Sequence, residues 1–273
     1  MNKKLRTLLT VVAGVGLVLL TAIQPVRAEG NNKADILFVH DTHSHLESFQ
    51  TLMDGKTQTV GGFAKLKTLV NEQKDKNPDT LILDAGDFSM GALVQTVYET
   101  EAAELRMLGH LGVDATTLGN HEFDYRSEGL ANMLTSAKDS GDELPELVMS
   151  NINWEAMETA GLTEEQELLK KAFAEYDVKE YVVIEKGDLD IAIMGVFGSD
   201  AWDCAPTCAF LFEDITVAAK RVVEKIEANE DVDMIVCVSH SGTWEEAEKS
   251  EDEILAKNVP EIDLIISGHT HTT

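Results

Sequence analysis

The sequence predicts an α/β domain built from layers of strands and helices. Short apolar runs of the kind that form buried strands alternate with longer segments whose apolar residues recur at helical spacing. The chain has 273 residues, of which 44% are hydrophobic, and this suits one large domain or two small ones with a substantial core. No internal repeat, low-complexity tract or long linker interrupts the alternation.

The expected elements follow from local signals along the chain. Phe63, Leu66, Leu69 and Val70 share one face of a predicted helix, and Thr163 with Gln166 has the spacing of a capping box. Strands are expected at 34–39, 146–152, 179–198 (two strands joined at Gly187–Asp188), 232–240 and 262–269, and 80–87 and 114–124 are each expected to be a strand followed by a loop. Helices are expected at 61–76, 92–112, from about Ser127, 163–176, 215–229 and 243–258.

Residues 1–28 are typical of a secretory signal peptide. The basic start "MNKKLR" precedes the apolar run "LLTVVAGVGLVLLTAI", and Val26 and Ala28 form a small-residue cleavage pattern. A permanent membrane anchor is the alternative, because the run approaches the ~18 residues that can span a bilayer. We therefore expect an exported protein, extracellular, at the cell surface or periplasmic, with no stable membrane span once the peptide is cleaved.

The charge and the cysteines exclude some classes of partner and site. A formal net charge of −27 disfavours binding to nucleic acid polymers and to anionic membrane surfaces. The three cysteines lack the spacing of a zinc finger. In an exported protein Cys204 and Cys208 could form a disulfide, and both states stay open, whereas Cys237 is expected inside a buried strand.

Side chains that bind metals well follow five of the strand-like runs. Because ligands gather at the carboxyl ends of the strands in open α/β sheets, we expect these side chains to converge at one edge. Glycines accompany them and allow sharp turns and close backbone approach, at Gly86, Gly119 and Gly268. The converging side chains are Asp41 and His43, then Asp87, then Asn120, His121 and Asp124, then His240, and finally His269 and His271.

The donor types favour a catalytic metal site over a structural one. Histidine, carboxylate and amide donors without a thiolate suit Zn, Mn, Fe or Co. The donors suffice for two divalent ions if one carboxylate bridges them. Two ions can stabilise both the attacking and the leaving oxygen of a displacement at phosphorus.

The series D-x-H, G-D, G-N-H-E, H and G-H-x-H resembles the calcineurin-like metallophosphoesterases. "GNHEFD" and "SGHTH" are similar to the secreted bacterial 5′-nucleotidase branch, which includes UDP-sugar hydrolases and cyclic-nucleotide phosphodiesterases. The resemblance runs from about Ala34 to His271. It implies a four-layer α/β/β/α sandwich of two mixed sheets with flanking helices, and hydrolysis of small phosphate esters, above all nucleotides.

The resemblance also implies a role for each side chain. His121 corresponds to a catalytic histidine that binds no metal, and Asp124 would orient it, while Asn120 and His121 would contact the substrate. Asp87 would bridge the two ions. The first ion would be held by Asp41, His43, Asp87 and His271, and the second by Asp87, Asn120, His240 and His269.

Neighbouring polar residues are expected to be less direct participants. Strand alternation points His40 away from Asp41, and Glu122 is expected to be structural. His45 stays open between a surface residue and a contact to the substrate or to a ligand.

Several functions fit the resemblance. A 5′-nucleotidase-type phosphomonoesterase acting on extracellular nucleotides is favoured, with a 2′,3′-cyclic-nucleotide phosphodiesterase or a UDP-sugar hydrolase as alternatives. A non-catalytic surface or binding protein is the alternative of another class, but every expected ligand is present. Only Thr272 and Thr273 follow His271, so residues 29–273 are expected to form a catalytic domain truncated at its C-terminus, without a nucleotide-binding domain.

Overall fold

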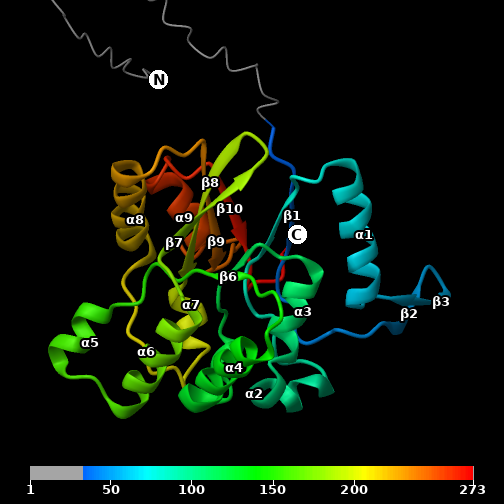
Figure 1. Ribbon diagram of the computed structural model, residues 1–273, viewed down its shortest axis with the longest axis horizontal. Helices are drawn as coiled ribbons and strands as arrows, with labels where there is room; N and C mark the ends of the chain where they lie inside the picture. Colours follow the sequence, from blue (N-terminus) through cyan, green and yellow to red (C-terminus); the bar gives the residue numbers. More distant parts are fainter. Residues whose placement is uncertain (1–32, 273) are drawn as a thin grey trace, which may run out of the picture. The chain divides into compact units, whose positions relative to one another are not determined.

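The computed structural model describes residues 33–272, and the predicted signal peptide lies outside the described residues. Two four-stranded sheets form the centre of the domain (Figure 1). The first is parallel and runs in the order β1 (Ile36–Val39), β4 (Leu81–Asp84), β5 (Ala115–Thr116) and β6 (Glu146–Leu147). The second runs β10 (Leu264–Ser267), β9 (Met234–His240), β8 (Leu189–Phe197) and β7 (Tyr181–Lys186), and only β7 is antiparallel to its neighbour.

Alternating side chains on each strand pack into different layers. In β4, Leu81 and Leu83 belong to the apolar core between the sheets, whereas Ile82 belongs to the core beneath the helices. In β8, Ile191 packs between the sheets and Ala192 packs outward. Because the side-chain period of a strand is two, apolar residues at every position make both faces of a sheet hydrophobic. Both sheets are therefore covered on both faces.

Helices complete the outer layers. One core joins the first sheet to helices α1 (Phe63–Lys76), α3 (Ala103–Leu111), α4 (Arg126–Ser140) and α6 (Glu164–Tyr176). Another joins the second sheet to α8 (Ile215–Asn229) and α9 (Glu251–Asn258), as Figure 1 shows. The predicted α/β/β/α sandwich is confirmed. The first sheet is parallel rather than mixed, because a helix connects each of its strands to the next.

Two predicted helices are shorter than expected. The stretch 92–112 divides into η1 (Leu93–Val97), α2 (Tyr98–Glu101) and α3, because Ala102 adopts a left-handed conformation with φ 46°. Residues 243–250 are loop, and only α9 is helical. The Thr243 amide donates to Thr270 Oγ1 instead, over 3.3 Å, which draws this loop onto the segment after β10.

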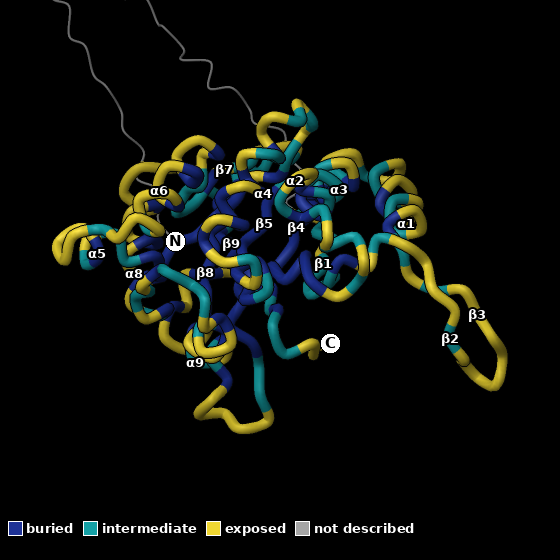
Figure 2. Tube along the Cα trace, turned by 90° about the horizontal axis from the view of Figure 1, so that it is seen from below, coloured by how far each residue is buried: buried dark blue, intermediate teal, exposed yellow. Residues whose placement is uncertain are grey.

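Five short elements were not predicted. A hairpin of β2 (Phe49–Met53) and β3 (Lys56–Val60) turns at Asp54–Gly55, where both residues have positive φ. The Asp-Gly pair is a strong hairpin signal, but the flanking strands are mostly exposed, as Figure 2 shows, and lack a clear apolar alternation. The others are the short helices η2 (His121–Phe123), α5 (Trp154–Ala160) and α7 (Ser199–Asp203).

The structure also tests the expectations for the cysteines and for a membrane-spanning helix. Cys204 and Cys208 are both free thiols in the structure, and Cys237 is buried in β9 as predicted. Within residues 33–272, no helix has the length and apolar character required to cross a membrane.

Candidate metal centre

The segments that follow five strands meet where the two sheets come together. The Asp41 amide donates to the Gly86 carbonyl over 3.0 Å, which ties the loop after β1 to the loop after β4. The Gly268 amide donates to the Ser239 carbonyl over 2.8 Å, which ties β10 to β9. The His269 amide lies 3.1 Å from both carboxylate oxygens of Asp41 and donates to that carboxylate. This contact joins the β1–β4 loops to the β9–β10 loops. The predicted convergence of the strand ends is confirmed.

The first cluster consists of Asp41, His43 and His271. His43 Nε2 lies 2.9 Å from His271 Nε2, and Asp41 Oδ1 lies 3.4 Å from His271 Nε2. His43 Nδ1 faces the Met90 carbonyl at 3.1 Å, so Nε2 is the nitrogen left to face the cluster. Donor atoms held by one ion at bond lengths of about 2.0–2.2 Å lie about 3.3 Å apart, which matches this spacing.

The second cluster consists of Asp87, Asn120, His240 and His269, of which the first three are buried and His269 is partly exposed. His240 Nε2 lies 3.2 Å from Asp87 Oδ2 and 3.3 Å from Asn120 Oδ1. His269 Nδ1 lies 3.0 Å from the same Asn120 oxygen. His240 Nδ1 donates to the Ala85 carbonyl over 2.8 Å, which again leaves Nε2 to face the cluster.

Asp87 lies between the two clusters. The Asp87 carboxylate has an oxygen within 4.8 Å of donor atoms of His43 and His121. It also has an oxygen within 4.8 Å of donor atoms of His240 and His269. Burial by itself would raise the pKa of Asp87, but the His240 imidazole outweighs burial and lowers it. Burial by itself would lower the pKa of His240, but the charge of the Asp87 carboxylate and its hydrogen bond act against burial, and the pKa of His240 is raised. A carboxylate shared in this way is the group that could bridge two cations.

His121 lies beside the clusters and is oriented by a carboxylate. Its Nδ1 is 2.7 Å from Asp124 Oδ2, and its ring centroid is 5.1 Å from that of His43. Burial lowers the pKa of His121, but the hydrogen bond to Asp124 and the charge of Asp87 outweigh it, so the pKa is raised. The partner that the sequence assigned to His121 is therefore in contact with it.

Glu122 organises the loops from beneath. Its carboxylate accepts hydrogen bonds from the amides of Gly119 (2.6 Å), Asp87 (3.0 Å) and Ser89 (3.0 Å), and from the Ser89 hydroxyl (2.7 Å). Burial and the nearby Asp87 charge raise its pKa to about 8. Its structural role was predicted. Gly119 packs so closely that an added Cβ would lie 2.2 Å from Asp87 Oδ1, so the loop tolerates no side chain there.

Two contacts differ from the sequence-based expectations. His40 does not point away from Asp41: its Nδ1 lies 2.6 Å from Asp41 Oδ2. The alternation fails because Asp41 leaves the strand with φ 51°. Asp200 was missed altogether, yet its Oδ2 lies 2.8 Å from His269 Nε2. It comes from α7, which no sequence signal had predicted.

The donor set fits two divalent cations. Each cluster offers imidazole nitrogens and carboxylate or amide oxygens, the donors that suit zinc, manganese, iron or cobalt. His43 and His240 each engage the other ring nitrogen with a backbone carbonyl, which is the usual second contact of a metal-binding imidazole.

Comparison with known proteins agrees with this geometry. Residues 34–273 match the calcineurin-like phosphoesterase family. The chain belongs to that family. It is thus a member of a family of metal-dependent phosphoric ester hydrolases.

Individual relatives of this calcineurin-like phosphoesterase carry nucleotide-related names. The 5′-nucleotidase of Bos taurus is 31% identical, over 87% of this chain and 38% of its own length. The trifunctional nucleotide phosphoesterase protein YfkN of Bacillus subtilis is 29% identical, over 87% of this chain and 16% of its own length.

A solved structure shows the same fold. The 5′-nucleotidase precursor of Thermus thermophilus superposes with a TM-score of 0.69 at 28% identity, over 88% of this chain and 42% of that one. The chain therefore spans less than half the length of each of these relatives.

Proposed function

We propose that this chain hydrolyses phosphate esters with the help of two divalent metal ions, as a 5′-nucleotidase-type phosphomonoesterase. The observation that carries the proposal is the meeting of two donor clusters at Asp87, with the His121–Asp124 pair beside them. Relatives named 5′-nucleotidase support nucleotides as the substrates. The pattern of residues 1–28 supports action outside the cytoplasm, on extracellular nucleotides.

The two clusters supply the ligands of the proposed ions, which would be zinc, manganese, cobalt or iron. Such ions, when bound, provide Lewis-acid stabilisation to a phosphoryl group. Asp87 is assigned to both ions because it faces both clusters. The remaining ligands are Asp41, His43 and His271 for the first ion and Asn120, His240 and His269 for the second.

His121 is proposed to act on the substrate directly. Asp124 holds Nδ1, so Nε2 is the ring nitrogen available to a phosphoryl oxygen or a leaving oxygen. An imidazole held in this way can donate a hydrogen bond to developing charge and protonate a leaving group that needs it. Asn120 would contact the phosphoryl group from the second cluster.

A second candidate reaction is hydrolysis of diesters, as in a 2′,3′-cyclic-nucleotide phosphodiesterase or a UDP-sugar hydrolase. The similarity to a protein named trifunctional nucleotide phosphoesterase supports a test of more than one kind of nucleotide phosphoester. A non-catalytic binding protein on the same fold is disfavoured, because the donor set of both clusters is complete.

The test is a substrate panel with metal control. The purified protein, stripped of metal and then supplied with Mn²⁺, Zn²⁺ or Co²⁺, is assayed on a 5′-nucleotide, a 2′,3′-cyclic nucleotide, a UDP-sugar and an aryl phosphate. The proposal expects metal-dependent release of inorganic phosphate from the 5′-nucleotide. Turnover of diesters alone would favour the second candidate, and no turnover with any metal would contradict both.

A further inference from the structure

His269 is held from two sides by side chains of different elements. Its Nδ1 lies 3.0 Å from Asn120 Oδ1, and its Nε2 lies 2.8 Å from Asp200 Oδ2. Turning the ring over would place carbon atoms at both contacts, so the two partners together select one orientation. The His269 side chain is 9% exposed and that of Asp200 is 50% exposed, so the carboxylate lies at the outer edge of the site.

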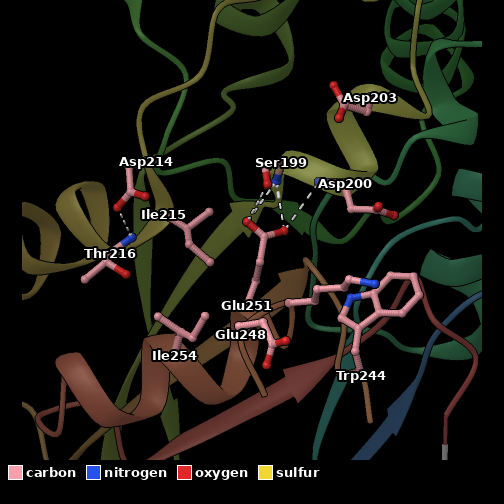
Figure 3. Close-up of a pocket in the computed structure, with 11 residues that line it drawn as sticks. Ser199, Asp200, Asp203, Asp214, Ile215, Thr216, Trp244, Glu248, Glu251 and Ile254 are labelled. Atoms are coloured by element: carbon pink, nitrogen blue, oxygen red, sulfur yellow. Dashed lines mark hydrogen bonds between the residues drawn. The ribbon is translucent and has the colours of Figure 1, made fainter. Parts of the chain in front are cut away.

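Asp200 is not free to follow the imidazole, because its helix is anchored. The Glu251 carboxylate, at the start of α9, accepts hydrogen bonds from the Ser199 amide at 2.9 Å and from its hydroxyl at 2.9 Å, and it lies 3.4 Å from the Asp200 amide. Figure 3 shows the Glu251 carboxylate facing the start of the helix, with dashed lines to Ser199 and Asp200, and the Asp200 side chain directed away from it. Glu251 thus satisfies the exposed amides at the start of α7.

We propose that Asp200, with its helix anchored by Glu251, is a positioning residue that keeps His269 in the Nε2–H tautomer and presents Nδ1 to the second metal ion. The inference rests on the proposed function only for its final step, the binding of metal by Nδ1. Both ring nitrogens face acceptor oxygens, but the ionised Asp200 carboxylate at Nε2 is a stronger acceptor than the Asn120 amide oxygen at Nδ1, so the proton is favoured at Nε2. A carboxylate behind an imidazole also raises the basicity of the opposite nitrogen as a ligand.

This arrangement distinguishes His269 from His43 and His240, two other imidazoles of the donor set. His43 and His240 engage Nδ1 with backbone carbonyls and present Nε2. His269 would present the opposite nitrogen, and its outer contact is a charged side chain rather than backbone. A single substitution can therefore release the orientation of His269, whereas the backbone contacts of His43 and His240 cannot be removed in this way.

The test compares three variants of the full chain with the parent. Asp200→Ala removes the acceptor, and Asp200→Asn keeps one neutral acceptor oxygen. Asp203→Ala is the matched control, because Asp203 is an exposed carboxylate on the same helix and, like Asp200, lines the pocket drawn in Figure 3. Thermal unfolding of the metal-free proteins checks that each variant is folded.

The first readout needs no metal. Imidazole ¹⁵N shifts of His269 in metal-free protein, recorded at about pH 8, report the tautomer. The parent and Asp203→Ala are expected to show the proton on Nε2, and Asp200→Ala a mixture of tautomers. A parent with the proton on Nδ1, or an unchanged Asp200→Ala, would overturn the proposal.

The second readout is a Co²⁺ titration followed by absorption. Asp200→Ala is expected to weaken one of the two bound ions by about 10- to 100-fold, the usual cost of losing such a contact, with Asp200→Asn intermediate. Equal affinities in the parent and Asp200→Ala would overturn the positioning role while leaving the proposed function intact. A parent that binds no Co²⁺ would instead contradict the proposed function and the assignment of Nδ1, whatever the tautomer.

Discussion

The two donor clusters are built from similar side chains but are held very differently. In the second cluster, the side chains of His240 and Asp87 are 0% and 3% exposed. In the first, the side chain of His271 is 60% exposed, and within residues 33–272 its Nδ1 has no hydrogen-bond partner. The difference is one of support rather than of donor type.

The support of the second cluster comes from α9. Glu251 anchors α7 and with it Asp200, and Asp252 lies beneath the ends of β9 and β10. The Asp252 carboxylate accepts hydrogen bonds from the Ser239 and Ser267 hydroxyls, each at 2.5 Å, and from the Gly242 amide at 3.1 Å. Donors that are ordered before the ion arrives lose less conformational freedom on binding. We therefore expect the second ion to bind more tightly than the first.

The largest effect is expected from the residue that the clusters share. Asp87→Ala should remove a ligand from both ions, so activity should fall to the level of metal-stripped protein and metal content should drop for both sites. Hydrolysis of a 5′-nucleotide and elemental analysis measure the two outcomes. Near-parental activity with two bound ions would show that the clusters do not share this carboxylate.

A smaller effect is expected from the histidine that lies outside both clusters. His121→Asn should keep both ions and lower turnover by ~10²–10⁴-fold, because a positioned acid–base group is lost and no ligand is. Turnover and metal content are measured on the same preparation. Loss of an ion would place His121 among the ligands, and unchanged turnover would remove it from the reaction.

Local periodicity predicted a layered α/β domain, and the polar residues that end each strand predicted that the strand ends converge. The four-layer sandwich was implied by the resemblance to the calcineurin-like metallophosphoesterases. The sequence could not predict which residues outside the strand ends contact and position the metal-binding side chains. Asp200 lies on a one-turn helix, and its contact with His269 joins residues 69 positions apart. The error at His40 has a local cause, since the backbone turns at Asp41 one residue earlier than strand alternation assumes.

Asp252, which lies beneath the second cluster, should also make the free energy of unfolding depend on pH. Burial outweighs the three donors and raises the pKa of Asp252 to about 6, above its value of about 3.9 in an unfolded chain. The folded protein therefore holds this proton more tightly than the unfolded one. The stability that this residue contributes is fully present below about pH 4 and is lost as the pH rises to about 6.

Asp252→Asn removes that titration. Urea unfolding of metal-free protein at about pH 4 and about pH 7 should show the parent losing about 2 kcal/mol more than the variant between the two. Glu253→Gln, on an exposed residue of the same helix, is the control and should follow the parent. A parent and an Asp252→Asn variant with the same pH dependence would mean that Asp252 does not titrate in this range.

The most direct test of the difference between the clusters is a stepwise Co²⁺ or Zn²⁺ titration of the metal-stripped parent, His240→Ala and His271→Ala. The account predicts two ions per parent chain, with affinities that differ by about tenfold or more because ordering the exposed imidazole costs about 1.4 kcal/mol. His271→Ala should lose only the weaker ion, and His240→Ala should lose the tighter one. Two ions of equal affinity in the parent, or loss of the tighter ion from His271→Ala, would contradict it.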